Sequence, residues 1–359
     1  MVTTRANCET NPLYFPELRT AGSRGKKQNC AMQLFNEDRE RLVYRLRRYL
    51  SGASDRILDE RLTDIAQNIY TFTRDGQVGL VENGARDLWA GLLAHLNIEC
   101  ETRGRETVRP ERIGGLTFTR ENLAKFLQQP DVLRRSFDAP IYCRYGDRQW
   151  MEALQKDGAA LLRPASYYSS STLNAARRDD ELTYLSYVCP NDYDLGLVDA
   201  RLARLNPGRS FGEIVHRKPS DHYLYSVSTG FHVRLYADFF ANTCLVIRDQ
   251  AEFERRLVAC VRAALPDWYI EFGNVWYGDP FSKPVILPNE GAQIFFLKHI
   301  RYMYQCEFRL VALPLAASNK PLPSLPISLG DLRDITELVP LEGHPFAQPS
   351  LELERGATQ

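Results

Sequence analysis

The sequence predicts an α+β protein in which an N-terminal helical module precedes a largely antiparallel β-sheet. Apolar residues recur at helical spacing in the first third of the chain. After Pro140, short aromatic and β-branched segments are separated by turn residues. These segments do not alternate with helices in a regular βαβ pattern, so an antiparallel sheet is favoured over a parallel one.

These changes in sequence pattern divide the chain into four regions. Residues 1–34 lack periodicity and carry basic residues among Gly, Ser and Asn, which indicates a flexible basic arm. Residues 35–138 form the helical module, and residues 139–314 form the sheet domain. Residues 315–359 are Pro-rich and are expected to wrap the surface or to be partly disordered.

Capping residues mark the expected helix starts. Asn36 precedes acidic residues, and Ser54 or Asp55 precedes an apolar stripe that runs to Phe72 and ends at Asp75-Gly76. Two further helices are expected around 88–96 and 119–127. In the second half, Asp147 and Asp249 begin helices, and an amphipathic helical turn covers 231–239.

Strand-like segments account for most of the remaining sheet domain. They are rich in aromatic and β-branched residues and are bounded by turn signals. The expected strands are 141–145, 160–163, 184–188, 213–217, 222–228, 244–247, 269–277, 293–298 and 302–314. Between the second and third, Arg178, Asp180 and Glu181 suggest a salt-bridged helix start rather than a catalytic cluster.

Composition limits the possible functions. The 359 residues are 44% hydrophobic, and 45 Lys and Arg balance 45 Asp and Glu, so no global basic field suggests a nucleic-acid or membrane partner. The eight cysteines form no CxxC pair, and the six histidines form no i, i+4 pair, so we expect no metal. We expect a cytoplasmic protein, or one delivered into a target-cell cytoplasm without a cleavable signal.

Phosphate-loop, dinucleotide-binding, zinc-protease and nucleophile-elbow motifs are absent from the sequence. The remaining candidates for catalysis are three groups of polar residues within strand-like segments. They are Arg144, Ser228-Thr229 and Gln305-x-Glu307. Strand alternation predicts that Gln305 and Glu307 face the same side, with Cys306 opposite.

Two interpretations of these residues are open. A strand arginine offers forked donors to phosphate, and a carboxylate oriented by hydroxyls stabilises positive charge on a sugar ring, as glycosidic bond cleavage requires. Alternatively, Arg144 and Glu307 form a buried ion pair and the serine satisfies a strand end.

The order Arg, then Ser-Thr-Gly, then Gln-x-Glu, each on a strand, resembles the Arg–Ser–Glu branch of the ADP-ribosyltransferase superfamily, which includes bacterial toxin and phage-defence enzymes. The resemblance covers roughly residues 140–314. It implies a split antiparallel sheet with NAD in a cleft. The chain departs from the usual pattern in having Ser-Thr-Gly in place of Ser-Thr-Ser, and in the long span before Gln305.

The resemblance also implies roles for individual residues. Glu307, Gln305 and Ser228 would be catalytic, with Glu307 stabilising the ribosyl cation and Gln305 placing the acceptor. The residues implied in NAD binding are Arg144, Ser228, Thr229, Gly230, Phe231 and Tyr236. Tyr236 is the candidate to stack on nicotinamide, with Phe231 and Tyr223 behind it, although core packing of these rings is equally open.

The implied function is NAD-dependent mono-ADP-ribosyl transfer to a macromolecular acceptor, either a protein side chain or an RNA or DNA base. NAD would be the substrate, and a neutralising antitoxin or immunity partner is expected. A non-enzymatic partner- or nucleotide-binding protein on the same fold, or an NAD glycohydrolase, are the alternatives.

Overall fold

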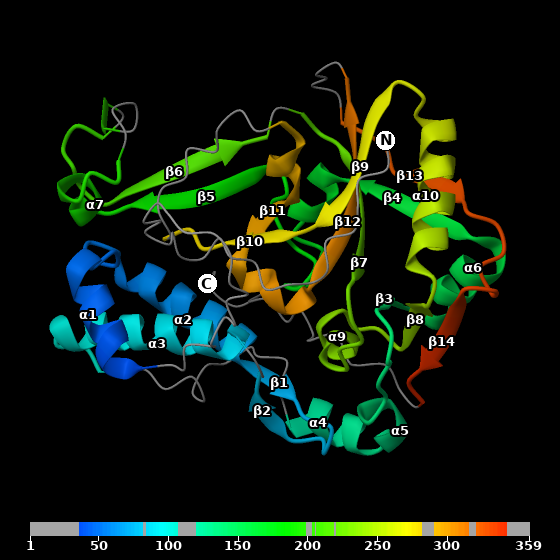
Figure 1. The fold of residues 1–359 in the computed structure, drawn as a ribbon, viewed down its shortest axis with the longest axis horizontal. Helices are drawn as coiled ribbons and strands as arrows, with labels where there is room; N and C mark the ends of the chain where they lie inside the picture. Colours follow the sequence, from blue (N-terminus) through cyan, green and yellow to red (C-terminus); the bar gives the residue numbers. More distant parts are fainter. Residues whose placement is uncertain are drawn as a thin grey trace, which may run out of the picture.

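A computed structural model describes residues 36–81, 84–106, 120–198, 203–204, 206–218, 220–281, 291–315 and 321–342. The described chain is a mixed α/β structure with a largely antiparallel sheet, as expected (Figure 1). The predicted basic arm, residues 1–34, lies outside the described residues. No helix of the described ranges is long and apolar enough to cross a membrane.

The helical module contains a β-hairpin as well as helices. Its elements are α1 (Glu37–Arg47), α2 (Asp55–Ile69), β1 (Tyr70–Phe72), β2 (Val78–Leu80), α3 (Gly84–Thr102), α4 (Arg120–Leu127) and α5 (Pro130–Leu133). The caps are confirmed, since Asn36 accepts from the Arg39 amide at 3.1 Å and Ser54 accepts from the Ile57 amide at 3.4 Å.

The helix expected to continue to Phe72 ends earlier, at Ile69. Tyr70–Phe72 instead pairs with Val78–Leu80. The turn between the two strands is closed by a 2.8 Å bond from the Thr73 amide to the Gln77 carbonyl, with Gly76 at φ 72°. The Asp75-Gly76 signal is therefore a hairpin turn and not a helix end.

The central sheet has eight strands, and all of its neighbouring strands are antiparallel. The order β13-β4-β7-β3-β8-β14 forms one path, and β12 pairs with both β7 and β9. The strands are β3 (Tyr142–Gly146), β4 (Ala159–Pro164), β7 (Tyr223–Ser228), β8 (Thr243–Ile247), β9 (Trp268–Asn274), β12 (Glu307–Pro314), β13 (Leu325–Ser328) and β14 (Thr336–Pro340).

The sheet is split at β7. One edge of β7 pairs with β12 along its whole length, from Tyr223 to Ser228. The other edge is shared, because Tyr223 and Leu224 pair with β4 whereas Ser228 pairs with β3. The gap between these two partners leaves the middle of β7 without a ladder on that edge.

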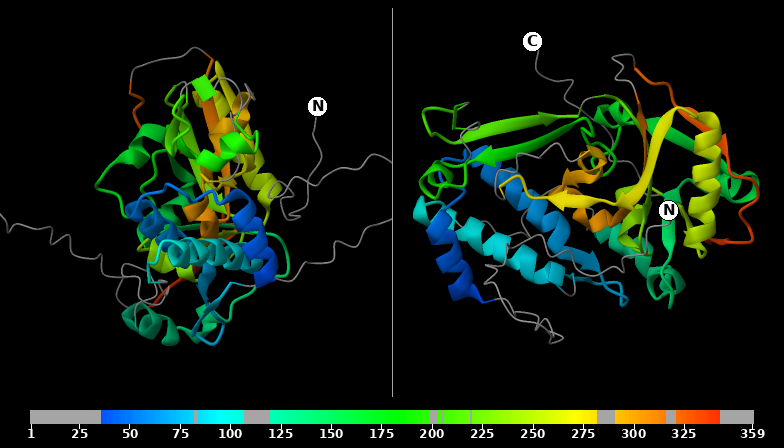
Figure 2. Two further views of the ribbon diagram at one scale, coloured as in Figure 1. Left: turned by 90° about the vertical axis from the view of Figure 1, so that its left-hand side faces the viewer. Right: turned by 45° about the horizontal axis from the view of Figure 1, so that its top comes forward.

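Smaller elements complete the fold. They are α6 (Arg148–Asp157), η3 (Ala165–Ser169), β5 (Thr183–Val188), α7 (Pro190–Asp194), β6 (Gly212–Arg217), α9 (Arg234–Asp238), α10 (Gln250–Ala264), β10 (Trp276–Gly278), η4 (Gly291–Phe296), β11 (Leu297–His299) and η5 (Ile300–Gln305). The β5–β6 ribbon extends over the helical module, and α10 stands beside the central sheet (Figures 1 and 2).

Two corrections concern the C-terminal half. Residues 293–296 and 302–305 were expected to be strands, but they belong to the 3₁₀ segments η4 and η5. The region expected to be a surface tail supplies β13 and β14, which lie at the two ends of the sheet path. Pro326 is compatible with β13 because an edge strand needs only one hydrogen-bonded side.

Candidate functional site

The strands that carry the three motifs are neighbours. Arg144 is on β3, Ser228 ends β7 and Glu307 begins β12. Ser228 pairs with Cys143 on one side and with Glu307 on the other, so one cross-strand row joins the three strands. Residues far apart in the sequence are therefore brought together at one end of β7.

Ser228 and Thr229 hold the backbone that precedes Glu307. The Ser228 hydroxyl donates to the Gln305 carbonyl at 2.8 Å, and the Thr229 hydroxyl and amide donate to the Cys306 carbonyl at 3.0 and 2.8 Å. Because these bonds end on main-chain oxygens, the two residues position the turn and do not contact the Glu307 carboxylate.

The turn itself departs from the expected strand. Gln305 ends η5, Cys306 adopts the left-handed conformation at φ 46° and ψ 54°, and the strand begins only at Glu307. The prediction that Gln305 and Glu307 share a face because they alternate along one strand is therefore wrong, since only Glu307 belongs to the strand. Their side chains nevertheless converge, because Lys298 Nζ donates to Gln305 Oε1 at 3.1 Å and to Glu307 Oε1 at 2.5 Å.

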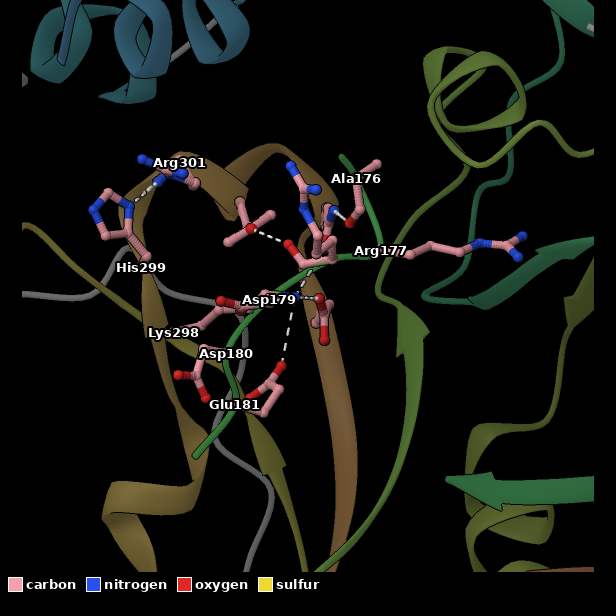
Figure 3. A network of polar contacts seen from close by, with 12 residues as sticks. Ala176, Arg177, Asp179, Asp180, Glu181, Lys298, His299 and Arg301 are labelled. Atoms are coloured by element: carbon pink, nitrogen blue, oxygen red, sulfur yellow. Dashed lines mark hydrogen bonds and ion pairs between the residues drawn. The ribbon is translucent and has the colours of Figure 1, made fainter. Parts of the chain in front are cut away.

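Glu307 is the centre of a buried group of charges. Its second oxygen accepts from Arg309 Nη2 at 2.8 Å, and Arg309 also binds both oxygens of Glu181 at 2.8 and 3.0 Å. Lys298 lies 3.7 Å from both Asp179 and Glu181, and Lys218 lies 3.7 Å from Glu181. We call these six residues the charge network; its three carboxylates match its three cations. Figure 3 shows Asp179, Glu181 and Lys298 of this network.

The network controls the protonation of its acids. Burial favours the neutral form of Glu307, but the charges of Lys298 and Arg309 outweigh burial and lower its pKa to about 2. Burial and the charge of Glu181 instead raise the pKa of Asp179 to about 6. Glu307 is therefore ionised at neutral pH, and Asp179 is the acid of the network whose charge is least compensated.

Arg144 does not pair with Glu307. Its Nη1 donates to the Ser226 carbonyl, in the stretch of β7 between the β4 and β3 pairings, and its guanidinium lies 4.5 Å from the centre of the Tyr225 ring. The alternative of an Arg144–Glu307 ion pair is therefore wrong. Glu307 instead forms its buried ion pairs with Lys298 and Arg309.

The ring proposed to stack on nicotinamide is in the core. Tyr236 is 0% exposed, packs edge-to-face with Tyr145 and donates its hydroxyl to the Val339 carbonyl at 2.7 Å. Tyr223 is buried against Trp268, and half-buried Phe231 packs on Phe137. Because no face of the Tyr236 ring is free, core packing is the interpretation that the structure supports for it.

Gly230 follows β7 without an unusual φ angle. A Cβ at this position would lie 3.1 Å from His232 Nε2, so packing gives a reason for a small residue here. Thr229 and Gly230 are both half-buried. Their position beside the turn that precedes Glu307 keeps them near the charge network, with no contact that assigns them a ligand.

Sequence reasoning missed most of the charge network. Lys298 is on β11 within an apolar segment, and Lys218 follows β6. Glu181 was assigned to a salt-bridged helix start, whereas it is 4% exposed within the turn that directly precedes β5. One signal was present, since Arg309 is two residues from Glu307 on the same strand and therefore shares its face.

Within the described ranges, no group of three or more His, Cys, Asp or Glu side chains is placed to hold a metal ion. No family model, curated protein or solved structure matched the chain. The site is therefore interpreted from its own geometry.

Proposed function

We propose that the protein is a NAD-dependent mono-ADP-ribosyltransferase that cleaves the nicotinamide glycosidic bond of NAD and transfers ADP-ribose to a macromolecular acceptor. The observation that carries this proposal is the cross-strand row Cys143, Ser228 and Glu307, which brings the Arg, Ser-Thr and Glu motifs onto three adjacent strands. The split in the sheet at β7 agrees with the fold that the resemblance implies.

In this proposal Glu307 supplies the negative charge that faces the developing ribosyl cation. Its low pKa keeps it ionised at neutral pH. Lys298 now occupies one of its oxygens at 2.5 Å, but Asp179 and Glu181 lie 3.7 Å from the same ammonium. Lys298 can exchange partners through a small movement within the network, which would free Glu307 for a ribose hydroxyl.

The acceptor in this proposal is a protein side chain or an RNA or DNA base. Gln305 would place it, although its amide nitrogen now donates to the Ala176 carbonyl at 2.7 Å. A toxin or phage-defence role is part of the proposal, together with a neutralising partner that protects the producing cell. Healthy growth under strong induction without such a partner would count against this role.

The test is incubation of the full chain with NAD labelled in the adenosine part and a cell lysate. Wild type and Glu213→Gln should label macromolecules, and Glu307→Gln should lower labelling at least about 100-fold. Glu213 is a suitable control because it is exposed on β6. Equal labelling by Glu307→Gln overturns the proposal. Separate analysis of protein and RNA fractions identifies the acceptor, and free ADP-ribose without labelled macromolecule would identify a glycohydrolase.

A second candidate is a non-enzymatic protein that binds a partner or nucleotide on the same fold. The observation that favours it is the mutual neutralisation of the three carboxylates and three cations of the charge network, which is what a structural ion-pair network requires. Absence of NAD binding by calorimetry, together with unchanged biological activity of Arg144→Ala, would select this candidate over the transferase.

A further inference from the structure

Two arginines near the open stretch of β7 lack an acidic partner. Arg144 of β3 donates to the Ser226 carbonyl, and Arg177, in the segment between η3 and β5, donates to the Phe239 carbonyl at 2.9 Å. Neither arginine forms an ion pair with a carboxylate of the described residues. Because a guanidinium carries five N–H donors, each of the two keeps most of its donors for a further acceptor.

The two guanidinium groups lie close enough to influence each other. The pKa of Arg177 is lowered, first by partial loss of solvent around its guanidinium and second by the charge of Arg144. Asp147 acts in the opposite direction, but it forms no ion pair with either arginine in the described part of the chain. The charge network is balanced within itself, so it does not offset the two arginines, and they retain a positive excess.

Tyrosines of η3 lie in the same region. The strand before η3 is β4, and the β4 and β3 pairings border the two ends of the open stretch of β7. Burial raises the pKa of Tyr168, and the charge of Arg144 is the largest influence that opposes burial. Tyr167 and Tyr168 also act on Arg177. The Tyr168 hydroxyl makes no hydrogen bond within the described ranges, so it offers a further donor near both arginines.

The segment that carries Arg177 is fixed on both sides of this residue. The Asn174 amide group donates to the Asp238 carbonyl at 3.1 Å, and the Ala176 carbonyl accepts from Gln305 at 2.7 Å. Figure 3 shows the Arg177 side chain pointing away from the charge network. The guanidinium is therefore held apart from the balanced charges, which lowers the cost of ordering it when a ligand binds.

We infer that Arg144 and Arg177 together bind a diphosphate group, which the two guanidinium groups contact from different segments of the chain. Guanidinium groups bind phosphate oxygens through paired, charge-assisted hydrogen bonds, and a diphosphate offers enough oxygens for two of them. Arg177 is not among the residues to which the resemblance gives a role, so it is an additional binding residue. The assignment of this diphosphate to NAD rests on the proposed function, whereas the anion site itself does not.

The experiment is calorimetric titration of the full chain with ADP and with inorganic pyrophosphate at low salt concentration, with adenosine as the analogue that lacks the diphosphate. ADP and pyrophosphate should bind saturably, and adenosine should bind at least about tenfold more weakly than ADP. Arg144→Gln and Arg177→Gln should each weaken ADP binding about tenfold or more, because each removes charge-assisted hydrogen bonds. Arg178→Gln is the control, since it removes the same charge at the next, exposed position, and it should bind as wild type does.

Four results would overturn the inference. They are the absence of saturable binding by either phosphate ligand, equal binding of adenosine and ADP, wild-type affinity of Arg177→Gln, or an equal loss in Arg178→Gln, which would show a general effect of net charge. A thermal melt of each variant shows whether it is folded. If Arg144→Gln does not fold because its bond to Ser226 is lost, the exposed Arg177 decides the test.

The outcomes for the diphosphate site and for the proposed function are separable. Binding of ADP through both arginines, without Glu307-dependent labelling by NAD, would retain the diphosphate site and count against the transferase. Glu307-dependent labelling, with wild-type affinity of Arg177→Gln for ADP, would overturn the diphosphate site and retain the transferase.

Discussion

Glu307 illustrates how a buried carboxylate depends on its partners. It is 9% exposed, and each of its oxygens accepts from a different cation. A buried ion pair contributes little compared with an apolar pair of the same size, but removal of one partner leaves an uncompensated charge and costs about 3–5 kcal/mol. The network is therefore sensitive to single substitutions even though its net contribution is small.

This sensitivity gives a pH-dependent prediction for Glu307→Gln. The folded pKa of Glu307 is lowered from 4.5 to about 2, so its charge stabilises the fold above the unfolded pKa, and this stabilisation is lost as pH falls through the folded pKa. At pH 7 the variant should lose about 3 kcal/mol of unfolding free energy. The difference from wild type should shrink steadily between about pH 4.5 and pH 2, as measured by urea denaturation.

Glu213→Gln is the control for this measurement and should match wild type at every pH. A double variant with Lys298→Met should recover part of the loss, because it restores the equal numbers of carboxylates and cations in the charge network that Glu307→Gln disturbs. A Glu307→Gln penalty that is independent of pH over this range would contradict the assignment of the low pKa.

At the level of single residues, the sequence could single out Glu307 and offered Arg309 on the same strand, but it could not identify the partners on other elements. A carboxylate beside an apolar strand is visible in the sequence because it is costly to bury. Lys298 and Glu181 reach it from other elements, and only the tertiary fold brings them within contact distance. Arg144 was also singled out, but its main contact is a backbone carbonyl, which residue type alone does not reveal.

At the level of elements, the six expected strands from 141–145 to 244–247 were predicted within one residue at each end, whereas the expected strand 269–277 is divided into β9 and β10. The predictions failed where the surroundings decide the conformation. Residues 302–305 are rich in strand-forming side chains, yet they belong to η5, because Asn68 of α2 accepts from the Tyr304 amide at 2.9 Å and the N-cap residue His299 accepts from the Arg301 amide at 3.1 Å.

The region after Pro314 provides a test at this scale. Leu332 is 0% exposed between β13 and β14, whereas Leu315 is 75% exposed. Leu332→Ala should therefore lower the unfolding free energy by about 2–4 kcal/mol, because it leaves a cavity in the core. Leu315→Ala should change it by less than about 0.5 kcal/mol.

Chemical denaturation of both variants measures the difference. Equal and small effects would mean that the region behaves as the surface tail expected from its proline content. A large effect of Leu332→Ala alone would show that β13 and β14 are integral parts of the sheet domain.

At the level of the whole molecule, the helical module and the strand domain share buried polar contacts. Arg61 on α2 binds Asp279, which follows β10. Asn68, also on α2, donates to the Arg301 carbonyl at 2.8 Å as well as accepting from Tyr304. The segment that leads into Glu307 is therefore held by the N-terminal third of the chain.

Asn68→Ala should weaken this connection. The change leaves the half-buried Arg301 carbonyl and Tyr304 amide without their partner, at a cost of about 1–3 kcal/mol. Because both regions depend on these contacts, calorimetry should show one transition at a lower temperature. Gln128→Ala, at an exposed position, should leave the transition unchanged. Two separated transitions in wild type would contradict this coupling.

The bond from Arg144 to Ser226 has a consequence for evolutionary comparison. Arg144 stabilises the fold by donating to a carbonyl in the part of β7 that lacks a strand partner on one edge, whatever the protein's function. Invariance of this arginine among descendants of a common ancestor would therefore say little about catalysis. Positions whose side chains lack such a structural task are the ones at which inheritance would report selection for ligand binding.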